Sequence, residues 1–197
     1  MDLKDASNAG KSGDSRFLKK ILTDAEIEYV KNADNPDLAL WSLWACKETA
    51  YKVMKKNFSG TAFIPRRWQI LLTKAHSDYS EGEVQISEKV GVHIRLFSSS
   101  HYIHCVGSDS LDALDKLIRN VETLPKEETN PSLFSRHCLA QSLANHFSLD
   151  LHQIKIKRNR QDGELQPPQV CVDGKKTNID VSLSHDGRFV ACAFLKK

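Results

Sequence analysis

The spacing of the apolar residues in this chain changes at Gly60, and this change limits the folds that the chain can adopt. Before Gly60, apolar residues between Asp37 and Lys56 recur at helical spacing, which predicts one long amphipathic helix. After Gly60, glycine-separated apolar runs predict an antiparallel meander of strands, at residues 68–72, 83–86, 93–97 and 101–106. A long helix beside such a meander predicts an α+β fold.

The rest of the chain shows a similar pattern. The spacing predicts helices over 110–121 and 135–147, strands over 153–157 and 169–172, and a hairpin over 180–194. A charged stretch with two prolines predicts a linker. We therefore expect a first half at 1–123, a linker at 124–132 and a second half at 133–197. Residues 93–106 resemble residues 180–193, which indicates two related halves with a pseudo-twofold arrangement.

Composition argues against several classes of protein. The net charge of +3 is too small for a dense nucleic-acid-binding stripe, although residues 155–160 and the pair Arg66-Arg67 keep nucleic-acid binding as a minor alternative. No apolar run reaches the ~20 residues needed to span a membrane, and the polar N-terminus does not resemble a signal peptide. Five cysteines without a CxxC pair predict free thiols and a cytoplasmic location.

The predicted long helix carries the first group of residues with potential chemistry. Glu48 and Lys52 are four residues apart and share a helix face, whereas Lys47 points elsewhere. Such a pair is common as an exposed ion pair. Trp44, one turn before Glu48, favours a partly buried carboxylate that could hold a divalent cation beside a phosphate-binding lysine.

A second group lies near the C-terminus, where Ser184 and His185 precede the hairpin turn. Adjacent strand residues face opposite sides of a sheet, so this pair favours phosphate binding over a nucleophile–base pair; ordinary turn chemistry is the alternative. Arg158 and Arg160 belong to a basic run that either contacts phosphate or protects an edge strand. The triplet Gly10-Lys11-Ser12 lacks the earlier glycine of a phosphate-binding loop, and we reject that reading.

These motifs resemble those of a known family. W-x-x-K-E-x-x-x-K, at Trp44, Lys47, Glu48 and Lys52, is similar to the signature helix of the 4′-phosphopantetheinyl transferase superfamily. S-L-S-H-D-G-R-F-V-A-C-A-F, at residues 182–194, resembles the Ser-His hairpin of that family, and residues 16–26 resemble the segment before its signature helix. The resemblance implies a holo-acyl-carrier-protein synthase type of transferase, which moves phosphopantetheine from coenzyme A to a serine of an acyl or peptidyl carrier protein.

The resemblance also implies roles for the matching residues. Glu48 would bind Mg²⁺ and help to deprotonate the carrier serine, Lys52 would contact the phosphates, and Lys47 would support the site. The adenosine-phosphate end of coenzyme A would be bound by Ser184 and His185. Lys157, Arg158 or Arg160 would compensate for a phosphate-binding lysine that the family often has nearby and this chain lacks. Carriers of this kind serve fatty acid, polyketide and peptide synthesis.

The order of the motifs matches the short holo-acyl-carrier-protein synthases, and is swapped relative to the two-half, surfactin-synthetase-activating transferases. Two halves in this swapped order imply a monomer with one active site in a cleft between the halves. Asp2 resembles the final acid of the family's metal-binding pattern, so the principal aspartate would lie upstream. Either the chain is truncated there, or Asp2 or Asp5 substitutes, or metal binding is lost. In the last case, the chain would be a catalytically impaired module that binds coenzyme A or a carrier protein.

Overall fold

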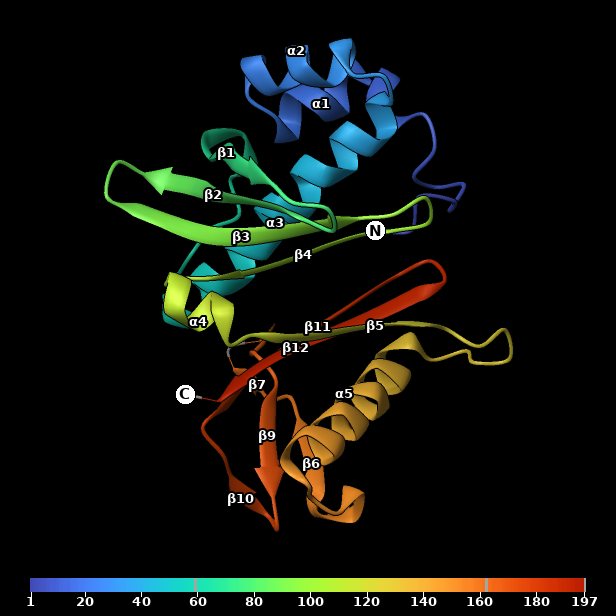
Figure 1. Ribbon diagram of the computed structural model, residues 1–197, viewed down its shortest axis with the longest axis vertical. Helices are drawn as coiled ribbons and strands as arrows, with labels where there is room; N and C mark the ends of the chain where they lie inside the picture. Colours follow the sequence, from blue (N-terminus) through green and yellow to red (C-terminus); the bar gives the residue numbers. More distant parts are fainter. Residues whose placement is uncertain (59, 162, 197) are drawn as a thin grey trace. The chain divides into compact units, whose positions relative to one another are not determined.

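The computed structural model describes residues 1–58, 60–161 and 163–196. The chain divides into two compact units, Met1–Asp115 and Lys116–Lys197, each built from helices and antiparallel sheet (Figure 1). This confirms the predicted α+β class. None of the helices in the described part of the chain is long and apolar enough to cross a membrane.

The first unit places three α-helices and two short 3-10 helices before a four-stranded sheet of order β1-β2-β3-β4, which is the predicted meander. Its elements are η1 (Lys11–Gly13), α1 (Ser15–Ile21), α2 (Asp24–Asn32), α3 (Pro36–Asn57), η2 (Pro65–Arg67), β1 (Gln69–Ala75), β2 (Ser80–Ser87), β3 (Val90–Ser98), β4 (Ile103–Ser108) and α4 (Leu111–Asp115).

The start of each of the first helices is fixed by its own cap. The sequence pattern T-x-x-E at Thr23 and Glu26 predicts a capping box, and the two side chains form it at the start of α2. Asn35 caps α3, and Pro36 occupies the first turn, where a missing N–H costs no hydrogen bond. The long predicted helix is therefore confirmed, with its start and end within a residue of the expected positions.

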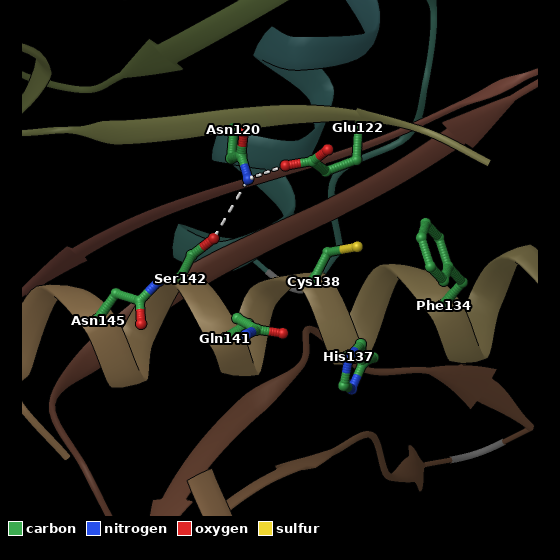
Figure 2. Close-up of a pocket in the computed structure, with 8 residues that line it drawn as sticks. All are labelled: Asn120, Glu122, Phe134, His137, Cys138, Gln141, Ser142 and Asn145. Carbon is green, nitrogen blue, oxygen red and sulfur yellow. Dashed lines mark hydrogen bonds between the residues drawn. The ribbon is translucent and has the colours of Figure 1, made fainter. Parts of the chain in front are cut away.

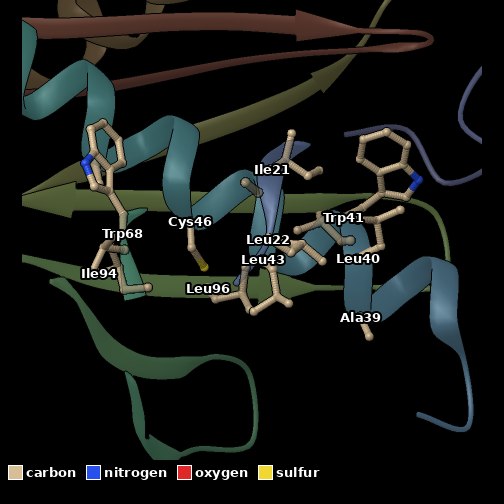
Figure 3. Packing of buried hydrophobic residues seen from close by; sticks show 14 of the residues in the cluster. Ile21, Leu22, Ala39, Leu40, Trp41, Leu43, Cys46, Trp68, Ile94 and Leu96 are labelled. Carbon is tan, nitrogen blue, oxygen red and sulfur yellow. The ribbon is translucent and has the colours of Figure 1, made fainter. Parts of the chain in front are cut away.

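The core of the first unit lies where α3 packs on the sheet. Leu40, Leu43 and Cys46 of α3 are buried together with Ile94 and Leu96 of β3 (Figure 3). The closest approach is at Gly107 of β4, where an added Cβ would lie 3.0 Å from the Thr49 methyl group and 2.9 Å from the His93 carbonyl oxygen.

The first 15 residues are polar, which predicts a surface loop, but the start of this segment pairs with the sheet instead. Asp2 is buried and pairs with Tyr102 in an antiparallel bridge. The Met1 ammonium donates to the Ile103 carbonyl oxygen at 2.8 Å, and the Ile103 N–H donates back to Met1 at 2.9 Å. Three residues are too few to show a strand period, so these backbone contacts left no signal in the sequence.

The Gly10-Lys11-Ser12 loop is fixed by Asp37 in the first turn of α3. The N–H groups of Gly10 and Ser12 donate to the Asp37 carboxylate at 2.9 and 3.1 Å. They are occupied within the protein, consistent with the rejection of a phosphate-binding loop. Burial alone would raise the pKa of Asp37, but hydrogen bonds from the Ser12 side chain and from these N–H groups lower it.

The second unit packs one long helix against two small sheets, with strand orders β11-β12-β5 and β10-β9-β6, and includes a two-stranded ribbon β7-β8. Its elements are β5 (Ile118–Thr123), α5 (Pro131–Phe147), η3 (Leu151–Gln153), β6 (Ile154–Lys157), β7 (Arg160–Gln161), β8 (Glu164–Leu165), β9 (Gln169–Val172), β10 (Lys175–Lys176), β11 (Ile179–Asp186) and β12 (Phe189–Lys196). Its core includes Leu139 and Leu143 of α5 against Val181 and Phe194.

One predicted helix is wrong in its second half. Within the segment 110–121, the helix is limited to the short α4 (Leu111–Asp115). Ile118–Thr123 is the strand β5, which pairs antiparallel with β12. Leu114, Leu117 and Ile118 fit helical spacing, but the pairing with β12 decides the conformation. The strand β5 belongs to the second compact unit, which begins at Lys116.

We predict that Gly107→Ala lowers the free energy of unfolding by about 1–3 kcal/mol, because the added methyl group has no room between α3 and β3. Urea denaturation measures this. Gly13→Ala is the control, since its Cβ meets nothing within 4 Å. Equal stability of the two variants would contradict the close approach of α3 and β4.

Asp37→Asn should lower stability at neutral pH by about 1–2 kcal/mol, because a charged acceptor of two backbone hydrogen bonds is lost. The lowered pKa of Asp37 stabilises the fold above the ordinary value of 3.8, and this contribution disappears as the pH falls through the lowered pKa. The deficit of the variant should therefore shrink below pH 3.8 in urea titrations. Asp34→Asn, at an exposed neighbour, should show neither effect.

Candidate active site

Helix α3 presents Glu48 and Lys52 to solvent on one face. The Lys52 Nζ lies 3.1 Å from the Glu48 Oε1, and the two side chains are 34% and 38% exposed. The predicted shared face and the partly buried carboxylate are thus confirmed. An ion pair with this exposure adds little stability, so both groups remain open to a ligand.

Lys47 lies on the opposite side of α3 and is completely buried. Its Nζ donates to the Ile21 carbonyl oxygen at 3.0 Å, to the Glu26 Oε2 at 2.5 Å and to the Pro65 carbonyl oxygen at 2.9 Å. Burial lowers the pKa of Lys47, although the Glu26 carboxylate opposes that shift. With all three ammonium hydrogens engaged inside the fold, Lys47 supports α3 from within rather than facing a ligand.

Glu26 completes this buried pair, and only its place in the capping box could be predicted from the sequence. Its Oε2 accepts the Thr23 N–H at 2.8 Å, and its Oε1 accepts the Ile70 N–H at 3.4 Å. One carboxylate therefore caps α2, accepts a hydrogen bond from the backbone of β1 and neutralises the charge of Lys47. A single buried pair fixes α3 relative to its neighbours one residue before Glu48.

An aromatic wall flanks the Glu48–Lys52 face, and sequence reasoning recognised only its first member. Trp44 and Tyr51 are one turn before and one turn after Glu48 on α3. The Phe63 ring lies 5.6 Å from the Trp44 ring and 4.9 Å from the Tyr51 ring, centroid to centroid. All three are only partly buried, so an apolar ligand group could lie against them beside the charged pair.

Asp2 is the other predicted metal ligand, and the main-chain contacts of β4 connect it to α3. It pairs with Tyr102 just before β4, and the Thr49 hydroxyl donates to the Cys105 carbonyl oxygen at 3.1 Å. These two points are three residues apart, about 10 Å along a strand. The Asp2 Oδ1 accepts the Lys4 N–H at 2.9 Å.

Carboxylate oxygens are the ligands that Mg²⁺ prefers, and it needs only one or two from the protein when substrate phosphates supply others. Asp2 and Glu48 fit such a site by their chemistry. Among the residues that the structure describes, no group of three or more His, Cys, Asp or Glu side chains is arranged to hold a metal ion.

In the second unit, Ser184 and His185 lie near the end of β11, as predicted. They pair with Ala191 and Val190 of β12. His185 is exposed and Ser184 is partly buried. Alternation along the strand turns the two side chains to opposite faces of the sheet, which argues against their acting as one catalytic pair.

The basic run is partly used in local structure. The Arg158 Nε donates to the Gln166 carbonyl oxygen at 2.9 Å, and the Arg160 Nη1 donates to the Gly163 carbonyl oxygen at 3.1 Å. Both side chains are exposed and keep further donors for an anion. In the first unit, Arg66 binds the Lys19 carbonyl oxygen at 2.7 Å and Asp24 at 3.0 Å, so a structural role explains it.

A groove of about 320 Å³ lies in the second unit between β5 and α5, and sequence reasoning did not predict it (Figure 2). Asn120 donates to the Glu122 Oε1 at 2.9 Å and to the Ser142 Oγ at 3.4 Å across it. Its described lining includes none of the predicted site residues; it consists of Asn120, Glu122, Phe134, His137, Cys138, Gln141, Ser142 and Asn145.

Comparison with known protein families assigns the first unit. Residues 1–106, more than half of the chain, match the family model of the 4′-phosphopantetheinyl transferase superfamily. The chain therefore belongs to this superfamily of transferases, as the motifs of α3 predicted. Neither the curated proteins nor the solved structures provide a match.

We predict that Glu26→Gln and Lys47→Met each lower the free energy of unfolding by about 3–5 kcal/mol, because each leaves an uncompensated buried partner. Urea denaturation is the measurement. Glu48→Gln, which breaks an exposed pair on the same helix, should cost less than about 1 kcal/mol.

The double variant Glu26→Leu/Lys47→Met separates the cost of an unpaired buried charge from the cost of changed packing. It removes both charges together and should recover part of the loss. The remaining deficit reflects the hydrogen bonds that Glu26 and Lys47 make to the backbone. If Lys47→Met were as stable as the wild type, Lys47 would not be the buried anchor described above.

Proposed function

We propose that this protein transfers the phosphopantetheine arm of coenzyme A to a serine of an acyl or peptidyl carrier protein, with Mg²⁺ as cofactor. The observation that carries the proposal is the match of residues 1–106 to the transferase superfamily, together with the exposed Glu48–Lys52 pair on the matched helix α3. The carrier serine would attack the β-phosphate of coenzyme A, and 3′,5′-ADP would leave, without a covalent enzyme intermediate.

Glu48 and Asp2 are the proposed Mg²⁺ ligands. Glu48 is partly exposed on α3 and Asp2 is held by backbone pairing beside β4. The ion would neutralise charge on the phosphates, which is the main requirement of phosphoryl-type transfer. Glu48 could also accept the proton of the carrier serine, because its carboxylate reaches solvent.

Lys52 is the proposed phosphate ligand on α3. Its Nζ lies 3.1 Å from Glu48, so a phosphate bound by Lys52 would lie next to a cation held by Glu48. The wall of Trp44, Tyr51 and Phe63 supports a place for the less polar part of the arm on the same side of α3. Lys47 contributes by fixing the helix and not by contacting the donor.

Ser184, His185, Arg158 and Arg160 are assigned to the adenosine-phosphate end of coenzyme A. Support comes from the exposed imidazole at the end of β11 and from the exposed guanidinium groups before β8. We further propose that the chain is a monomer whose units are related halves. Fatty acid synthesis is one pathway that such a carrier protein would serve.

One observation favours a second candidate function, a coenzyme A- or carrier-binding module without transfer activity. Asp2, one of the two proposed metal ligands, is buried, and its Oδ1 already accepts the Lys4 N–H. A chain that had lost its metal would bind coenzyme A equally well with and without Mg²⁺ in calorimetry and would form no product.

Glu48→Gln tests the transferase proposal. We expect at least a ~100-fold lower rate of phosphopantetheine transfer to an apo acyl carrier protein, because both a metal ligand and a proton acceptor are removed. Intact mass spectrometry over time measures the rate. Glu28→Gln, at an exposed site on α2, is the control and should keep full activity. Full activity of Glu48→Gln would refute the assigned role.

A further inference from the structure

Two thiols face each other between α3 and β4. The Sγ atoms of Cys46 and Cys105 are 4.0 Å apart, although the residues are separated by 59 positions in the sequence. All five cysteines are free thiols, and the other three, Cys138, Cys171 and Cys192, belong to the second unit. The first unit thus contains one isolated dithiol, placed two residues before Glu48.

The backbone around this dithiol is held close. The Thr49 hydroxyl bonds to the Cys105 carbonyl oxygen at 3.1 Å, and a Cβ at Gly107 would lie only 3.0 Å from the Thr49 methyl group. A disulfide has an S–S distance of about 2.05 Å, so the two sulfur atoms must approach by about 2 Å. Changes at the side chains or a small shift of α3 can supply that movement.

We propose that Cys46 and Cys105 are an oxidative modification site, at which a peroxide joins α3 to β4 through a disulfide. The peroxide oxidises the Cys105 thiol to a sulfenic acid and is reduced to water. The Cys46 sulfur then attacks the Cys105 sulfur. The S–O bond breaks, the S–S bond forms, and the hydroxyl leaves as water with the Cys46 proton. Each disulfide consumes one peroxide and two thiols.

The order of these steps follows from exposure. Cys105 is partly exposed, whereas Cys46 is fully buried, so the oxidant meets Cys105 first. The buried Cys46 is therefore the second thiol to react. The Cys46 sulfur lies 4.0 Å from that of Cys105, so it can act as the resolving thiol. Its closeness to Cys105 allows this reaction without a highly reactive thiol.

The disulfide should also affect the proposed transfer reaction, and this part of the inference rests on the proposed function. The two sulfur atoms must approach by about 2 Å, and we expect a shift of α3 to supply part of that movement. Glu48 and Lys52 lie on that helix, and a shift of about an ångström in a catalytic group can lower a rate by up to about a hundredfold. Oxidation would therefore reduce transfer reversibly.

The experiment exposes the full chain to hydrogen peroxide and maps its peptides without reduction. We expect loss of two of the five thiols, a single peptide pair joined through Cys46 and Cys105, and full reversal by dithiothreitol. Cys46→Ser should prevent the cross-link and leave Cys105 trapped as a sulfenic acid, which a dimedone label detects. Cys171→Ser, in the second unit, should cross-link as the wild type does.

Transfer to an apo carrier protein is measured on the same samples. Unchanged transfer in the cross-linked protein would overturn the effect on α3. Oxidation of Cys105 without a cross-link, or a cross-link between other cysteines, would overturn the site itself. If the reduced protein transfers nothing while the cross-link forms, the proposed function fails and the modification site stands.

Discussion

The buried ion pair between Lys47 and Glu26 connects the segments on which the first unit depends. Lys47 reaches the end of α1 and the start of η2, and Glu26 holds the cap of α2 and the start of β1. An unpaired charge at this depth would be strongly destabilising, so neither partner can be lost alone without weakening the contacts among these segments. The pair therefore specifies one arrangement of α3 among its neighbours.

This constraint explains how α3 combines two tasks. One side carries Lys47, Cys46 and Leu43 into the core, and the other presents Glu48 and Lys52 to solvent. The exposed pair adds little to stability and is free to serve a ligand, because the neighbouring lysine has already fixed the helix. In the proposed site, Lys47 supports the helix, and Glu48 and Lys52 bind the ligand. The membership of the chain in the transferase superfamily is the basis for that proposal.

The sequence predicted the parts of the fold that have strong periodicity or caps. The long helix, the capping box at Thr23, the four-stranded meander and the terminal hairpin are all confirmed. The strand at Ile118–Thr123 was missed because its apolar spacing fits a helix equally well until β12 pairs with it. The burial of Asp2 was missed because three paired residues show no period. For the site, spacing predicted the Glu48–Lys52 face, but Glu26 and Phe63 reach α3 from distant segments that no local pattern connects to it.

The most direct test of the central claim is intact mass spectrometry of an apo acyl carrier protein after incubation with this protein, coenzyme A and Mg²⁺. The account predicts the mass gain of one phosphopantetheine group on the carrier, dependent on both coenzyme A and the metal ion. An unmodified mass across acyl and peptidyl carriers, with coenzyme A binding retained, would contradict transfer and leave a binding module of the same superfamily.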